Sequence, residues 1–392
     1  MHAAAGTRTA GLALLALLAL PAHAQTKKLL ACAGPGDPMP CLLEGAEPDR
    51  SRLPAAGPAA WVNGNKLVLS WVGEADEVQV TGSMILPRPL KKVAPDLHQI
   101  VLQYPRAQDT RAQLRYAITR AGKTDYINNG VEIAGPRAFP MPQRGKINEV
   151  PMDFGKEAPK VTVWLPPGYK AGVRYPILYL GDGGGTAPGF MLSEPIRKGE
   201  LAPLIVVGVD YALEGKNDSD TRAATYLGAS NGTPAPIFLA HERFLLETVI
   251  PAVETKYGAP PELRLRAVGG ASNSAVWTTS MALRNPGVFG TAFALSPGVR
   301  PAQHGGARPS SRFYLSAGEL EPSFHFNAAC VAGEIVARGG VATFTAYPSG
   351  HDHVMWAHAL IEGVRDWLSP NQASPVLAAP PAADCKERRQ IL

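Results

Sequence analysis

Charged residues are scarce in this sequence, and they do not cluster. Asp, Glu, Lys and Arg make up 18% of the 392 residues, and the 38 Lys and Arg are spread along the chain without basic runs. Proteins that bind nucleic acid concentrate positive charge against its phosphates, so nucleic acid is not an expected partner. The hydrophobic content of 45% excludes disorder as the main state. The chain is long enough for one large or two ordinary domains.

No hydrophobic run is long enough to cross a membrane as a helix. The apolar run at 11–20 has about half of the roughly 20 residues that a span needs. It follows Arg8 and precedes Ala22-His23-Ala24, which is the order of parts in a secretory signal peptide. We therefore expect cleavage after Ala24 and a periplasmic or secreted protein. A lipoprotein anchor at Cys32 is the weaker alternative, because two lysines separate that cysteine from the apolar run.

Cysteine is also scarce, and its spacing does not suit a metal site. The four cysteines, Cys32, Cys41, Cys330 and Cys385, form no CxxC pair. In an exported protein, one or two structural disulfides are the expected use of them. Cys32 with Cys41 is the local pairing, which leaves Cys330 either bonded to Cys385 or free.

The first part of the exported chain is expected to be an arm followed by a β-domain. Residues 25–51 are rich in Gly, Pro and Asp and show no period, as an N-terminal arm would. Residues 52–137 contain short β-branched or aromatic segments divided by turn residues, which is typical of a small all-β sandwich of the immunoglobulin-like kind. The strands expected there are 66–71, 77–81, 99–103 and 113–119.

Residues 138–370 change to strands that alternate with helices, which predicts an α/β domain with a mainly parallel sheet. Several of these strands are continuous apolar runs, as buried parallel strands are. A Pro- and Ala-rich tail at 371–392 follows. The expected strands are 161–165, 177–180, 204–209, 265–268, 292–295, 313–315 and 342–347, and the expected helices are 238–257, 273–284, 326–338 and 354–368.

The sharpest local signal is Val268-Gly-Gly-Ala-Ser-Asn-Ser-Ala275, which follows a short apolar strand and begins an expected amphipathic helix. This position suits a nucleophile elbow, where small residues two places before and after the serine let strand and helix pass closely. Gly270 and Ser274 stand in those places around Ser272, so the usual second glycine is a serine here. From the motif alone, a Gly- and Ser-rich turn without a catalytic role is the alternative.

A serine nucleophile needs a base, and the base needs an acid that orients it. His351 follows the last expected strand, in a loop from which its imidazole could reach the elbow. His353 is the local alternative, and a metal site at this histidine pair lacks a distant partner of convincing spacing. Glu319 and Glu321 both follow the preceding strand, and residue chemistry alone leaves the choice of acid open.

The oxyanion formed during attack needs backbone donors. One is expected from Asn273, directly after the serine, and one from the glycines that end the strand at 177–180. Gly183 or Gly184 is expected to supply the second, and we favour Gly184. This loop lacks the Lys-Ser or Lys-Thr that continues a phosphate-binding loop.

With these residues assembled, the chain from about 145 to 370 resembles the putative esterase family of α/β-hydrolases, which includes feruloyl, acetylxylan and enterochelin esterases. Segments 67–72, 78–82 and 114–118 are similar to the N-terminal domain of enterochelin esterases, which favours that branch. The segments that carry the family resemblance are Val161-Thr-Val-Trp-Leu-Pro-Pro-Gly-Tyr169, Tyr175-Pro-Ile-Leu-Tyr-Leu-Gly-Asp-Gly183, Val206-Val-Gly-Val-Asp210, Thr248-Val-Ile-Pro-Ala-Val-Glu-Thr-Lys-Tyr257, the elbow with Asn285-Pro-Gly-Val-Phe-Gly290, and Ser349-Gly-His-Asp352 followed by Trp356.

The resemblance implies an α/β-hydrolase domain after a small sandwich, and it assigns further site residues. The family places its acid just before a proline, which selects Glu321. It carries an arginine after its third strand, matched by Arg222 as a contact for an anionic or catechol group. Trp356 is assigned to the substrate site. The chain departs from the family pattern at Ser274 and Ala275, which replace paired glycines, and at Tyr126, where proline is usual.

The expected function is an exported serine esterase whose cycle needs no metal and no organic cofactor. The expected substrate is a small-molecule ester, a ferric catecholate siderophore of the enterochelin trilactone type or its linearised form. Feruloyl or acetyl esters on cell-wall polysaccharide are the alternative substrates. A non-catalytic binding protein of the same fold is the alternative from a different class.

Overall fold

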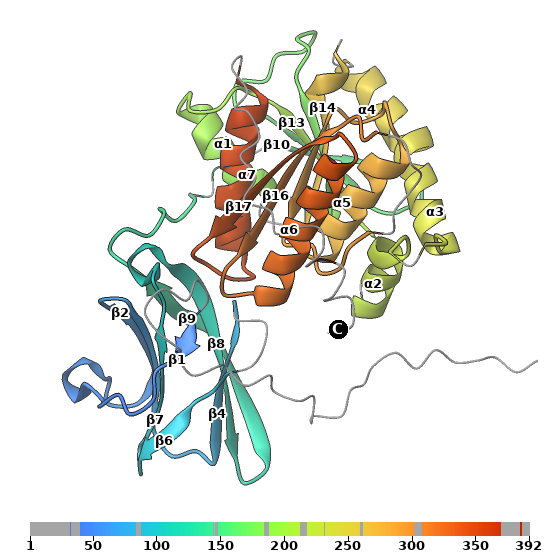
Figure 1. The fold of residues 1–392 in the computed structure, drawn as a ribbon. Helices are drawn as coiled ribbons and strands as arrows, with labels where there is room; N and C mark the ends of the chain where they lie inside the picture. Colours follow the sequence, from blue (N-terminus) through green and yellow to red (C-terminus); the bar gives the residue numbers. More distant parts are fainter. Residues whose placement is uncertain are drawn as a thin grey trace, which may run out of the picture.

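Figure 1 shows a computed structural model of the chain. The expected signal peptide, its cleavage site after Ala24 and all of the tail except Cys385 lie outside the described residues and stay predictions. Among the described residues, no helix combines the length and the apolar character of a membrane span. The described residues are Cys32, 40–83, 88–143, 145, 148–183, 188–211, 218–230, 232–258, 262–301, 308–369 and Cys385.

The N-terminal domain consists of two antiparallel sheets around one core (Figure 1). Alternate residues of the central strands point into that core, among them Val78 and Val80 from one sheet and Leu67 and Leu69 from the other. One sheet has the order β1-β7-β3-β2 with β6 beside β7: β1 (Cys41–Leu42), β2 (Gly57–Asn63), β3 (Lys66–Val72), β6 (Lys91–Ala94) and β7 (Leu97–Gln103). The other has the order β5-β4-β8-β9: β4 (Glu77–Gly82), β5 (Arg88–Pro89), β8 (Arg111–Arg120) and β9 (Lys123–Ala134).

The four strands expected from the sequence correspond to β3, β4, β7 and β8, each slightly longer than expected. Strand β1 lies in the segment expected to be an arm, and its residues pair with β7. The arm therefore contributes an edge strand to the sandwich, and the disulfide between Cys32 and Cys41 joins it there. A two-residue strand offers no alternating pattern, which is why the sequence did not predict it.

The second domain is built on an eight-stranded mixed sheet with the order β10-β11-β13-β12-β14-β15-β16-β17. Strand β11 is antiparallel to both β10 and β13, and the five remaining pairs are parallel. Parallel strands end at the same edge of a sheet, so the loops after β12, β14, β15, β16 and β17 gather there. The strands are β10 (Asn148–Met152), β11 (Val161–Leu165), β12 (Ile177–Gly181), β13 (Ile205–Val209), β14 (Arg266–Ala271), β15 (Thr291–Leu295), β16 (Arg312–Gly318) and β17 (Val341–Tyr347).

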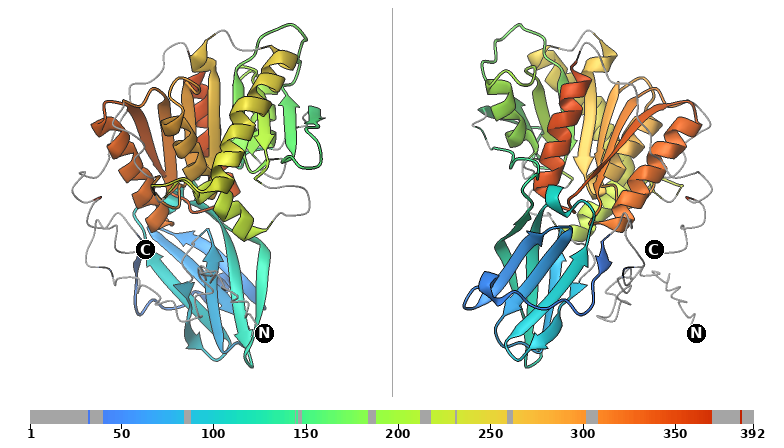
Figure 2. Two further views of the ribbon diagram at one scale, coloured as in Figure 1. Left: turned by 90° about the vertical axis from the view of Figure 1, so that its right-hand side faces the viewer. Right: turned by 60° about the vertical axis from the view of Figure 1, so that its left-hand side comes forward.

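Helices cover both faces of this sheet (Figure 2). Ile177 and Tyr179 of β12 pack on the face under α2 to α6, while Leu178 and Leu180 pack on the face under α1 and α7. The α-helices are α1 (Pro188–Arg197), α2 (Ser219–Leu227), α3 (Pro236–Arg243), α4 (Ile250–Tyr257), α5 (Asn273–Arg284), α6 (Pro322–Ala337) and α7 (His353–Trp367). Short 3-10 turns lie at Arg50–Arg52, Ala107–Asp109 and Leu263–Leu265.

The single helix expected at 238–257 is divided in the structure. A π-helical turn at Phe244–Val249 joins α3 to α4. Pro251 explains the wide turn, because in a regular α-helix its ring would clash with the carbonyl group of Glu247. A second disulfide joins Cys330 of α6 to Cys385. With Cys32 bonded to Cys41, Cys330 is therefore bonded and not free.

Candidate active site

Ser272 lies on a strained turn between strand β14 and helix α5. Its backbone angles, φ 60° and ψ −122°, fall outside the regions that non-glycine residues usually occupy. A Cβ atom on Gly270 would lie 2.6 Å from the carbonyl oxygen of Ser274, so this position needs a residue without a side chain. The strand, sharp turn and helix together form the geometry of a nucleophile elbow.

A hydrogen-bonded chain links Ser272 to a histidine and a buried carboxylate. The Nε2 atom of His351 lies 3.0 Å from Ser272 Oγ, and its Nδ1 atom lies 2.5 Å from Glu321 Oε2. The three residues come from the elbow and from the loops after β16 and β17. An imidazole held in this way can take the proton of the hydroxyl group while the carboxylate stabilises the charge that forms.

The carboxylate of Glu321 is fixed through its second oxygen. Oε1 accepts hydrogen bonds from the backbone N–H of Gly318 at 2.7 Å and from Ser296 Oγ at 2.6 Å. Ser296 Oγ in turn accepts a hydrogen bond from Nε1 of Trp356 at 2.8 Å. Ser296 was not predicted as a site residue. Its only signal in the sequence is its position at the end of an apolar strand, before a proline and a glycine.

The structure places the two alternative residues away from this chain of hydrogen bonds. Glu319 accepts hydrogen bonds from Tyr104 Oη and Arg106 Nη1 of the N-terminal domain. His353 is exposed at the first position of α7, and its ring lies against Trp356. Glu321, not Glu319, is therefore the carboxylate beside His351.

Trp356 is buried against His351. It is 8% exposed, and its ring meets the ring of His351 edge to face with centroids 4.7 Å apart. Phe324 packs against the same imidazole, with its ring centroid at 4.3 Å. The indole N–H of Trp356 is also bonded to Ser296, so Trp356 supports His351 and Glu321, and its assignment to the substrate site stays a prediction.

Arg222 takes part in a polar network behind the elbow. Its Nε and Nη2 atoms donate to the two carboxylate oxygens of Asp182, each at 2.6 Å, and Ser274 Oγ donates to Asp182 at 2.7 Å. Burial alone would lower the pKa of Arg222, but hydrogen bonding to Asp182 and its charge outweigh burial and raise it. The remaining nitrogen, Nη1, has no hydrogen-bond partner among the described residues.

The candidate oxyanion donors are partly within the described residues. Asn273 is the first residue of α5, and backbone N–H groups in the first turn of a helix have no acceptor inside that helix. Gly184 lies outside the described residues, so its assignment stays a prediction. Gly183 has φ 45°, and a Cβ there would lie 2.7 Å from the carboxyl carbon of Asp210. That close contact restricts the position to glycine.

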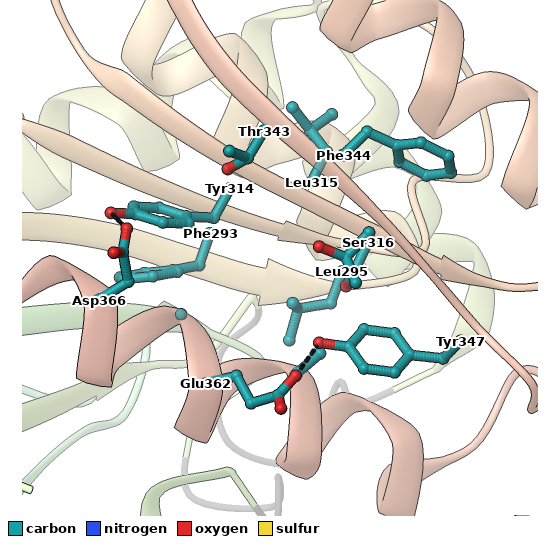
Figure 3. A pocket seen from close by; sticks show the side chains of 13 residues that line it. Phe293, Leu295, Tyr314, Leu315, Ser316, Thr343, Phe344, Tyr347, Glu362 and Asp366 are labelled. Atoms are coloured by element: carbon teal, nitrogen blue, oxygen red, sulfur yellow. Dashed lines mark hydrogen bonds between the residues drawn. The ribbon is translucent and has the colours of Figure 1, made fainter. Parts of the chain in front are cut away.

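A cavity of about 420 Å³ lies away from Ser272, between the sheet and α7 (Figure 3). Tyr314 donates to Asp366 and Tyr347 donates to Glu362 along its wall. Neither Ser272, Glu321 nor His351 lines it, so this cavity does not define the ester site. Within the described part of the chain, no cluster of three or more His, Cys, Asp or Glu side chains could hold a metal ion.

Residues 155–367 match the family model described as putative esterase. The match covers more than half of the chain. The protein is therefore a carboxylic ester hydrolase, as the elbow and its hydrogen-bonded chain indicate, and it belongs to the putative esterase family. A comparison with curated protein sequences found no match.

Two solved structures of enterobactin esterases resemble this chain at low sequence identity. The enterobactin esterase of Shigella flexneri, determined in the presence of enterobactin, is 15% identical with a TM-score of 0.58, covering 80% of this chain and 96% of that one. The ferric enterobactin esterase of Salmonella typhimurium is 13% identical with a TM-score of 0.59, covering 79% of this chain and 95% of that one. At these identities the likeness concerns the fold. The first of these matches covers 80% of this chain, whereas residues 155–392 make up less than two thirds of it. The likeness therefore includes part of the N-terminal domain.

Proposed function

We propose that the protein is an exported serine esterase in which Ser272 attacks the ester carbonyl carbon. His351 accepts the hydroxyl proton as the new bond forms and donates it to the leaving alkoxide, and Glu321 holds the imidazole in the correct tautomer. A water molecule then attacks the acyl carbon while His351 takes its proton, and the bond from Ser272 Oγ to the acyl group breaks as His351 returns that proton to the serine, which releases the acid. The observation that carries this proposal is the hydrogen-bonded chain from Ser272 to Glu321 at a strained elbow.

The oxyanion of each tetrahedral intermediate would lie at the N-terminus of α5. We assign one donor to the amide of Asn273 and the other to Gly184 in the loop after β12, since backbone N–H groups there can point at the developing charge without reorganising. Export is supported by the expected signal peptide and by two disulfides, which persist in oxidising compartments.

For the substrate, we propose a catecholate siderophore ester, either the enterochelin trilactone in its ferric form or a linear fragment of it. The support is the fold of both domains, which resembles that of enterobactin esterases. Arg222 adds a cationic group that is 26% exposed, and its Nη1 atom, which does not bond Asp182, is our candidate contact for an anionic or catechol oxygen. Esters of ferulate or acetate are the competing substrates.

Hydrolysis of p-nitrophenyl acetate tests the catalytic assignment. We expect Ser272→Ala to lose at least about 1,000-fold in kcat, since removal of a nucleophile leaves only binding and oxyanion stabilisation. Ser280→Ala is a matched control, because Ser280 is fully buried on α5 and its hydroxyl has no partner among the described residues. A Ser272→Ala variant as active as the wild type would overturn the proposed mechanism.

A second comparison separates the substrate classes. The wild-type protein is offered ferric enterobactin and methyl ferulate under the same conditions. We expect a higher kcat/KM for the siderophore, and a large preference for methyl ferulate would overturn the siderophore assignment while leaving the serine esterase mechanism in place.

A further inference from the structure

The N-terminal domain contacts the loop that carries Glu321. Leu320, the residue before this carboxylate, is 2% exposed and packs into the hydrophobic core of the sandwich. Among the described residues, it is the one member of that core from the esterase domain. The preceding residue, Glu319, accepts hydrogen bonds from Tyr104 and Arg106 of the sandwich. The loop that carries Glu321, called the acid loop below, is thus held by an apolar contact at Leu320 and a charged contact at Glu319.

The same domain contacts the loop that carries His351. The backbone N–H of His351 donates to the carbonyl oxygen of Ser83 at 2.9 Å, and Ser83 Oγ donates to Asp352 at 2.5 Å. The backbone N–H of Gln113 also donates to Asp352, at 3.3 Å. A Cβ on Gly350 would lie 2.1 Å from the Ser83 carbonyl oxygen, so a glycine is needed for the two domains to approach this closely.

The two loops are also joined to each other at this interface. The backbone N–H of Leu320 donates to the carbonyl oxygen of Ser349 at 2.9 Å, and that of Glu319 donates to Tyr347 at 2.9 Å. The sandwich therefore contacts a paired unit that holds both the acid and the base. Among the described residues, the side chain of Glu321 makes no hydrogen bond to the sandwich, so the domain acts on it through its neighbours in the loop.

We propose that the N-terminal sandwich is a positioning element of the active site, which aligns Glu321 and His351 with Ser272 by docking against both loops. Leu320 and Ser83 are its positioning residues. This inference rests on the proposed serine mechanism. Its physical basis is that a misplacement of about 1 Å in a catalytic group can cost about 100-fold in rate. Docking of this kind gives the domain a role in the chemical step, separate from any contact with the substrate.

The test compares two leucines buried in the same core. Leu320→Ala removes the anchor of the acid loop, whereas Leu90→Ala removes a side chain, 5% exposed, beside Val78 on β4. Both changes create a cavity of similar kind. We expect Leu320→Ala to lose about tenfold or more in kcat with little change in KM. Leu90→Ala is expected to keep the wild-type kcat, and Leu320→Met to restore most of the lost activity.

The rate of labelling by a fluorophosphonate provides a readout that does not depend on the natural substrate. It is measured well below the unfolding temperature of each variant, and we expect it to fall with kcat in Leu320→Ala. Equal labelling rates in wild type and Leu320→Ala, or an equal loss in Leu90→Ala, would overturn the inference. A wild-type protein that is not labelled at Ser272 would overturn the proposed mechanism as well.

Ser83→Ala is a second variant that keeps the sandwich core intact. It removes the hydroxyl that bonds Asp352 and retains the backbone contact to His351. We expect kcat to fall about threefold to tenfold, because Asp352 keeps its three backbone hydrogen bonds and the His351 loop is loosened and not displaced. An unchanged kcat together with an unchanged labelling rate would argue against the contact at the His351 loop.

Discussion

Replacement of Ser274 by alanine tests why a serine stands where the family pattern has glycine. Ser274 is fully buried, and its Oγ accepts a hydrogen bond from the backbone N–H of Ala271 at 2.9 Å. It donates to Asp182 at 2.7 Å, with the carbonyl oxygen of Ala271 as a second acceptor at 2.8 Å. This one hydroxyl thereby joins the elbow to the loop after β12. We infer that the serine is a structural part of the elbow and does not impair it.

The magnitude follows from the groups left without a partner. A hydrogen bond to a charged carboxylate contributes about 1.5–3 kcal/mol, and a buried amide without an acceptor costs a further 1–3 kcal/mol or so. The sum of these two contributions is an upper value, because Asp182 keeps its two hydrogen bonds from Arg222 and the structure around the missing hydroxyl can relax. We therefore expect Ser274→Ala to lower the free energy of unfolding by about 3 kcal/mol. Ser274→Gly is expected to cost about 1 kcal/mol more, because glycine is unfavourable within a helix.

Urea denaturation measures these values, with Ser280→Ala as the control. Ser280 is equally buried on the same helix, but its hydroxyl has no hydrogen-bond partner among the described residues. Removal of such a group is expected to leave the stability nearly unchanged. If Ser274→Ala were as stable as the wild type, or if the two alanine variants lost equal stability, the reasoning about the network would be refuted.

Three further predictions concern the acid, the domain contact and pH. Glu321→Gln is expected to lower kcat for p-nitrophenyl acetate about 1,000- to 10,000-fold, because the imidazolium loses its counter-charge; a larger loss in Glu319→Gln would contradict the assignment. Gly350→Ala places a methyl group 2.1 Å from the carbonyl oxygen of Ser83, and we expect at least about a tenfold loss of kcat, which wild-type activity would contradict. Burial lowers the pKa of His241 to about 4. Between pH 6.5 and 4 only the unfolded chain binds this proton, so the free energy of unfolding falls by up to about 3 kcal/mol as pH falls. Urea denaturation at pH 6.5 and pH 4 should show a smaller fall in the free energy of unfolding for His241→Gln than for the wild type. An equal fall in both proteins would contradict the assignment of this pH dependence to His241.

The strands and helices with strong patterns could be predicted from the sequence. The apolar run of β11 and the helix α5 have the same bounds in the structure as in the sequence analysis. Strand β10 was missed because it is a half-exposed edge strand that contains a proline and shows little hydrophobic pattern. The π-helical turn was also missed, since a periodicity of helical type continues through it.

The candidate site was predictable where chain order carries the information. Ser272 follows a strand, His351 follows the last strand, and both positions can be read from the sequence. The choice of Glu321 needed the resemblance, and the structure then placed it beside the imidazole. Ser296 was missed, and its hydrogen bond with Trp356 could not be foreseen because the two residues lie 60 positions apart in the sequence. Contacts across such distances depend on the folded arrangement of the loops.

The most direct test of the central claim is to find which residue a fluorophosphonate modifies. The wild-type protein is treated with the probe, its remaining esterase activity is measured, and the labelled peptide is identified by mass spectrometry. We predict one label, on Ser272, with loss of activity in proportion to labelling and no label in Ser272→Ala. A label on another residue, or full activity after complete labelling of Ser272, would contradict the account.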